Sequence, residues 1–71
     1  MSSKDLTFYL EQSRLLGADV KRYWENGEFI FCVYHHKWKL SFVERGTDQE
    51  DVAGRVFQIL SSFKQSYPEL W

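Results

Sequence analysis

The feature that most constrains the fold is the dipeptide Asn26-Gly27, which lies between two segments rich in β-branched and aromatic residues. Both residues accept the positive φ angles of a tight two-residue turn, so the dipeptide predicts a β-hairpin. The turn also fixes the register, because the residues on either side of it must face one another. The predicted cross-strand pairs are Trp24 with Phe29, Arg22 with Phe31, and Val20 with Val33.

A second turn is predicted at His35-His36. Either this turn or a four-residue loop from Tyr34 to Lys37 gives the same register, which pairs Val33 with Trp38, Phe31 with Leu40, and Phe29 with Phe42. Together the two registers describe a three-stranded antiparallel sheet over residues 19–44. One face of it is apolar apart from Arg22 and carries Val20, Trp24, Phe29, Phe31, Val33, Trp38, Leu40 and Phe42. A slip of one residue would scatter this set, so the agreement supports the sheet.

Helical patterns flank the predicted strands. The first covers residues 3–16, with an apolar stripe and with Gly17 at its C-terminal end. The second covers residues 47–66 and begins with a capping box, in which the Thr47 hydroxyl accepts from the Glu50 amide. Residues 67–71 form a short tail. We therefore predict an α+β fold of order α-β-β-β-α, a three-stranded antiparallel sheet with two helices packed on one face.

Composition limits the class of protein. A chain of 71 residues predicts one domain, and 44% hydrophobic with 27% charged residues is typical of a globular protein. The net charge of −1 argues against a dedicated nucleic-acid binder. The single cysteine, Cys32, cannot form an internal disulfide, which favours a cytoplasmic location. No apolar run reaches the roughly 20 residues that a membrane span needs, so no membrane association is expected.

The opposite face of the predicted sheet is unusual for a surface in water. Its central strand offers Ile30, Cys32 and Tyr34, where charged residues or threonine would be ordinary. The full predicted set is Lys21, Tyr23, Ile30, Cys32, Tyr34, Lys37, Lys39 and Ser41. Three interpretations stay open: a wet face covered by lysine stems, a protein-contact or homodimer surface, and a nucleic-acid surface with stacking tyrosines and phosphate-binding lysines.

The predicted element order is similar to that of double-stranded RNA-binding domains and of HicA-type toxin ribonucleases. The first resemblance implies RNA binding through a basic N-terminus of the second helix, yet the corresponding segment here, Thr47 to Asp51, is acidic. The second implies a catalytic histidine in a central strand, usually after Gly-Ser. This chain has histidine at a strand end, in Tyr34-His35-His36-Lys37, without Gly-Ser.

Catalytic patterns are otherwise missing from the sequence. Neighbouring strand residues point to opposite faces, so His35 and His36 cannot chelate one metal. Cys32 and His36 share a face but lie about 13 Å apart along a strand, too far for a common ion. No glycine-rich phosphate loop or Ser-His-Asp pattern is present. We therefore expect two exposed turn histidines, no cofactor, no metal and no enzymatic activity.

The leading prediction is a small cytoplasmic interaction module, a regulator, adaptor or inhibitor that acts through the outer face of its sheet. The predicted partner-binding residues are Lys21, Tyr23, Ile30, Tyr34, His36, Lys37, Lys39 and Trp71. The predicted partner is either a second copy of the chain or a different, acidic protein. In a homodimer the lysines of this face would approach their symmetry mates. The alternatives are an RNA- or DNA-binding domain and a ribonuclease that uses His35 or His36.

Overall fold

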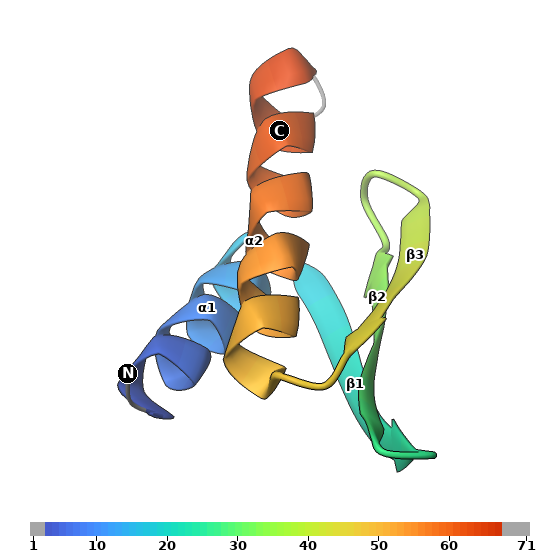
Figure 1. Cartoon of the computed structure of the whole chain (residues 1–71). Helices are drawn as coiled ribbons and strands as arrows, with labels where there is room; N and C mark the ends of the chain where they lie inside the picture. The colour runs from blue at the N-terminus through green and yellow to red at the C-terminus, as the bar shows by residue number, and fades with distance from the viewer. Residues whose placement is uncertain (1–2, 68–71) are drawn as a thin grey trace.

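The computed structural model describes residues 3–67, with side chains from residue 6 onward. The element order is α-β-β-β-α, as predicted. The helices are α1 (Ser3–Leu15) and α2 (Gln49–Ser66), and the strands are β1 (Ala18–Glu25), β2 (Glu28–His35) and β3 (Leu40–Gly46). Figure 1 shows the long helix α2 rising beside the sheet, with α1 next to it. The predicted tail beyond Tyr67, which includes Trp71, lies outside the described residues.

The β1–β2 hairpin has the predicted register. Strand β2 lies at the centre of an antiparallel sheet of order β1-β2-β3, and its pairing with β1 joins Trp24 to Phe29 and Val20 to Val33. Asn26 and Gly27 have φ angles of 53° and 79°, the left-handed values that the tight turn requires. The hairpin prediction is confirmed residue by residue.

The predicted β2–β3 register is wrong by four residues. Phe31 pairs with Glu44 instead of Leu40, and Val33 pairs with Phe42 instead of Trp38. The reason is that β2 continues to His35, and the chain reverses over His36 to Lys39, where Lys39 takes a φ of 54°. Trp38 therefore lies in this loop rather than in a strand, although it is buried as predicted.

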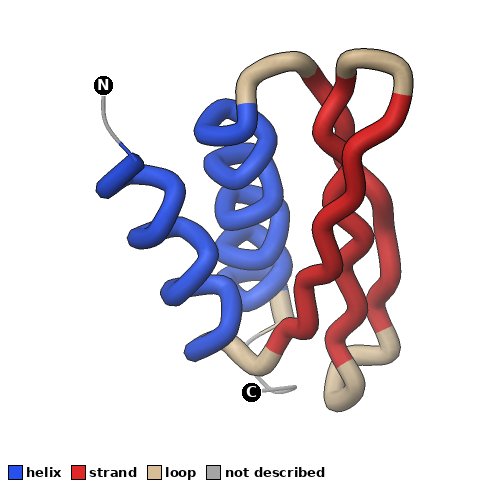
Figure 2. The backbone as a smooth tube through the Cα atoms, turned by 90° about the horizontal axis from the view of Figure 1, so that it is seen from below, coloured by secondary structure: helices blue, strands red, loops and turns tan. Residues whose placement is uncertain are grey.

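Both helices pack on one face of the sheet, which gives a two-layer structure (Figure 2). The slip in register was an even number of residues, so the predicted apolar face is still the face that meets the helices. The core consists of Ala18, Phe31, Val33, Trp38, Val52, Ala53, Val56 and Leu60. Phe31 and Leu60 are its largest fully buried apolar side chains.

Trp24 departs from the predicted core. Its side chain is on the helix side of the sheet but remains 62% exposed, with its ring 4.7 Å from that of Phe29. The last half of β1 is exposed on both faces, since Arg22, Tyr23, Trp24 and Glu25 are all exposed. The apolar stripe of the helices thus covers only part of the face that the sequence marks as core.

The start of α2 also differs from the predicted capping box. The N-cap is Asp48 rather than Thr47, and its carboxylate accepts a hydrogen bond of 3.0 Å from the backbone N–H of Glu50. Aspartate serves this role as well as threonine and adds negative charge at the positive end of the helix dipole. The other end of α2 is at Ser66, as predicted.

His35 is buried, which corrects the prediction of two exposed turn histidines. Its side chain is 2% exposed and its ring stacks on the indole of Trp38 at 3.8 Å. The backbone N–H of Trp38 donates to Nδ1 at 3.1 Å, so the ring hydrogen is on Nε2, which donates to the carbonyl of Leu16 at 2.6 Å. His35 thereby ties the α1–β1 corner to the β2–β3 loop.

The Gly17→Ala variant tests this corner. Gly17 has a φ of 97°, and a β-carbon added there would lie 2.8 Å from Nε2 of His35. Alanine would therefore combine backbone strain with a collision, and we expect a loss of about 2 kcal/mol in the free energy of unfolding. Urea denaturation measures this loss. Gly27→Ala is the control for strain alone, because its φ is also positive but no atom lies within 4 Å of its added β-carbon.

Candidate protein-binding face

The outer face is the side of the sheet that points away from both helices. Alternation along the paired strands assigns to it Asp19, Lys21, Tyr23, Glu25, Glu28, Ile30, Cys32, Tyr34, Ser41, Val43 and Arg45. The register sets these side chains in rows across the sheet. One row is Lys21, Cys32 and Val43, and the next is Tyr23, Ile30 and Arg45. Neither α1 nor α2 covers this face (Figure 2).

An apolar band crosses the middle of the outer face. It consists of Tyr23, Ile30, Cys32, Tyr34 and Val43. Tyr23, Tyr34 and Val43 are 54%, 40% and 56% exposed, while Ile30 and Cys32 are half-buried between them. Three of the large apolar side chains that the described structure leaves in water therefore gather on one surface. Grouped exposure of this kind is typical of interaction sites, whereas single exposed apolar residues are ordinary.

Charged residues border the apolar band. Arg45 Nε donates to a carboxylate oxygen of Glu28 at 2.9 Å, near the end of the sheet that holds the Asn26-Gly27 turn. At the other end, His36 Nε2 lies 3.5 Å from Asp19 Oδ2, and its ring meets the edge of Tyr34 at 4.6 Å. Both contacts are largely exposed, so each stabilises the fold by at most about 1 kcal/mol.

The structure brings together part of the predicted partner-binding set. Lys21, Tyr23, Ile30 and Tyr34 are on the outer face, and His36 is beside it. Lys37 and Lys39 are not on the face, which corrects their prediction: both lie in the His36–Lys39 loop, because β3 begins only at Leu40. Trp71 lies outside the described residues.

Five residues of the outer face were absent from the predicted set, namely Asp19, Glu25, Glu28, Val43 and Arg45. Val43 and Arg45 join the outer face because β3 continues to Gly46, and the alternation of Ser41, Val43 and Arg45 was the available signal. Asp19, Glu25 and Glu28 follow from the hairpin register, which was predicted, but the contact of Asp19 with His36 depends on the conformation of the β2–β3 loop.

The two histidines of the chain are each in contact with other groups. No group of three or more His, Cys, Asp or Glu side chains within this part of the chain could hold a metal ion. Both ring nitrogens of His35 are engaged inside the core, and the His36–Asp19 pair is open to solvent. Neither described helix is long and apolar enough to cross a membrane.

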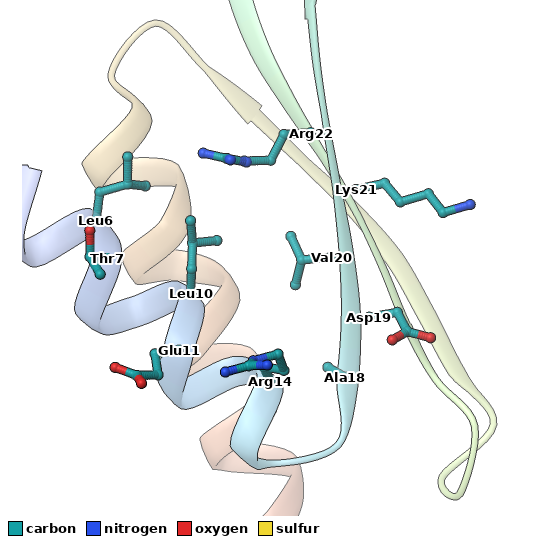
Figure 3. A pocket seen from close by; sticks show the side chains of 10 residues that line it. All are labelled: Leu6, Thr7, Leu10, Glu11, Arg14, Ala18, Asp19, Val20, Lys21 and Arg22. Carbon is teal, nitrogen blue, oxygen red and sulfur yellow. The ribbon is translucent and has the colours of Figure 1, made fainter.

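A groove runs between α1 and β1, on the helix side of the sheet. It has a volume of about 690 Å³ and is lined by apolar and charged side chains of both elements. Figure 3 shows Val20 and Arg22 pointing toward the α1 side, whereas Asp19 and Lys21 point to the outer face. On the β1 side the groove is lined by Ala18 to Arg22, and the remaining residues of β1 lie beyond it.

Comparison with protein-family models, with curated proteins and with solved structures found no match to this chain.

Proposed function

We propose that the protein is a small non-enzymatic interaction module that binds another protein through its outer face. The observation that carries this proposal is the apolar band, which lies uncovered on a sheet whose other face is packed. Tyrosines and aliphatic side chains around a desolvated centre are typical of protein interfaces. The hydroxyls of Tyr23 and Tyr34 add hydrogen-bonding capacity at its edge.

The charges around the band indicate which charges a complementary partner would carry. The end near the β2–β3 loop carries His36, Lys37 and Lys39 beside one acidic residue, Asp19, and the end near the Asn26-Gly27 turn carries Glu25 and Glu28 beside one basic residue, Arg45. A complementary partner presents an apolar patch with acidic groups at one border and basic groups at the other. Such an arrangement fixes orientation and speeds association more than it adds affinity.

A protein partner is favoured over a nucleic acid by the number of cations on the face. Lys21 and Arg45 are the described cations there, and Arg45 is paired with Glu28. Binding to a phosphate backbone needs several unpaired cations along one track. The single cysteine of the chain fits a reducing compartment, so we place the interaction in the cytoplasm.

The Ile30→Glu variant tests the proposal. Tagged wild-type chain captures partners from source cells, each candidate is purified, and its dissociation constant is measured by calorimetry. A glutamate at the centre of the band is expected to weaken binding by about tenfold or more, because a charge would be buried in the interface. The matched control is Gln58→Glu, which adds the same charge on the exposed side of α2 and should bind as wild type.

Two results would contradict the proposal. One is a purified partner that binds wild type and Ile30→Glu equally while both variants remain folded by circular dichroism. The other is capture of nucleic acid alone, with an affinity that falls linearly in the logarithm of salt concentration. The second result would establish the RNA- or DNA-binding alternative.

A further inference from the structure

Strand β1 presents a long and regular open edge. It lies at one side of the sheet, and all eight of its residues pair with β2 without a bulge. An unpaired strand edge is a template for another strand, and proteins that avoid such pairing usually interrupt the edge with proline, a bulge, a covering element or charged side chains that repel a second strand. Residues Ala18–Glu25 contain no proline. The groove between α1 and β1 is lined only by Ala18 to Arg22 on the β1 side, so the last residues of β1 lie beyond it (Figure 3).

The hairpin determines which backbone groups the open edge offers. In a hairpin with a two-residue turn, the residues that flank the turn exchange hydrogen bonds, and bonded and non-bonded pairs then alternate. Glu25 and Glu28 flank the turn, so Glu25, Tyr23 and Lys21 direct their peptide groups toward β2. Arg22 and Trp24 therefore direct theirs toward the open edge.

The side chains of β1 complement themselves in one antiparallel register. We propose that two copies of this chain pair through their β1 edges about a two-fold axis at Tyr23. Lys21 of each copy then faces Glu25 of the other, and Arg22 faces Trp24. The two Tyr23 side chains meet at the axis, as a two-fold interface requires. Opposite charges and a cation against an aromatic ring are both favourable cross-strand pairs.

Neighbouring registers are less favourable. An axis at Arg22 would set two arginines opposite each other and Asp19 opposite Glu25, and an axis at Lys21 would set two lysines together. An axis at Trp24 pairs only three residues of each strand. An axis at Val20 brings no like charges together, but it leaves Tyr23 and Trp24 outside the paired segment. It also pairs Asp19 with Lys21 of the other copy, although Asp19 already lies beside His36.

Pairing at Tyr23 accounts for the exposure of Trp24. This residue is 62% exposed on the helix side of the sheet. A second copy of β1 would cover it with the stem of Arg22. The two sheets of three strands would join into one of six, and their apolar bands would meet at the two Tyr23 rings. This dimer forms through the backbone edge of β1 and shares Lys21, Tyr23 and Glu25 with the border of the outer face, but it does not depend on the proposed function.

A charge-swap experiment tests the register. The mass of the full chain is measured by light scattering and by sedimentation over a range of concentrations, with circular dichroism to confirm folding. Wild type is expected to form dimers as concentration rises. Lys21→Glu and Glu25→Lys should each raise the dissociation constant by about tenfold or more, because each places two like-charge pairs across the interface. The double variant should dimerise as wild type does, and an equimolar mixture of the two single variants should form heterodimers.

The matched control is Asp19→Lys, which changes a charge of β1 outside the proposed pairs and should leave the mass unchanged. The proposal is overturned by a wild-type chain that stays monomeric at the highest concentration, or by folded single variants that dimerise as wild type does. It is also overturned if Asp19→Lys dissociates the dimer while Glu25→Lys does not, since that result places the axis at Val20. A dimer that Ile30→Glu dissociates would be formed through the outer face instead.

Discussion

Replacing Phe31 by alanine is expected to leave little of the folded state. Phe31 is completely buried at the middle of the central strand, on the face of β2 that packs against α2. Truncation of such a phenylalanine costs about 3–5 kcal/mol, from lost transfer free energy and from the cavity that remains. A core of this size supplies about the same total, so the variant should be largely unfolded at room temperature.

Thermal and urea unfolding, followed by circular dichroism, measure the effect of Phe31→Ala. Phe8→Ala is the control, because Phe8 is a phenylalanine of α1 that is half exposed. It should melt close to wild type. A Phe31→Ala chain that also melts within a few degrees of wild type would mean that the faces of the sheet are inverted, with Ile30, Cys32 and Tyr34 in the core.

The second large effect is expected for His35→Ala. The substitution removes the ring that stacks on Trp38 and leaves the N–H of Trp38 and the carbonyl of Leu16 without their partner. A buried cavity and two unsatisfied backbone groups together should lower the free energy of unfolding by about 3 kcal/mol or more. Urea denaturation gives the value directly.

Two further variants separate the causes of that loss. His36→Ala removes the neighbouring exposed histidine and should change stability by less than about 0.5 kcal/mol. His35→Leu keeps apolar volume but no hydrogen bond, so it should lie between wild type and His35→Ala. If His35→Leu were as stable as wild type, the two hydrogen bonds would contribute nothing and the described role of His35 would be wrong.

The two turns show what local sequence can specify. Asn26 and Gly27 are residues that tolerate positive φ, and the hairpin they form is predicted to the residue. The β2–β3 loop holds no such residue, and its positive φ is on Lys39, which carries no signal of that kind. The loop is placed by the burial of His35, whose ring bonds to the distant carbonyl of Leu16 and to the N–H of Trp38 within the loop. No periodicity in the sequence reports those contacts.

Most residues of the outer face were predictable from the alternation of side chains along the strands. The error in the β2–β3 register was an even number of residues, and an even slip leaves each side chain on its own face. Tyr23, Ile30 and Tyr34 were placed correctly because the β1–β2 hairpin register was itself correct, and the even slip kept Ser41 of β3 on the same face. Lys37 and Lys39 were misplaced, because the slip moved them from the strand into the loop. The exposure of Trp24 could not be predicted, since it depends on how far the helices extend over the sheet.

The rate of alkylation of Cys32 tests most directly whether the outer face is the docking surface. Cys32 is the single cysteine of the chain and lies in the apolar band, between Lys21 and Val43 across the strands. Its thiol should react with iodoacetamide in the folded chain and should be strongly protected when a purified partner is bound at saturation. Dimerisation through β1 should leave the rate unchanged. A thiol that reacts equally fast with and without bound partner would contradict the account, because the partner would then be seated elsewhere.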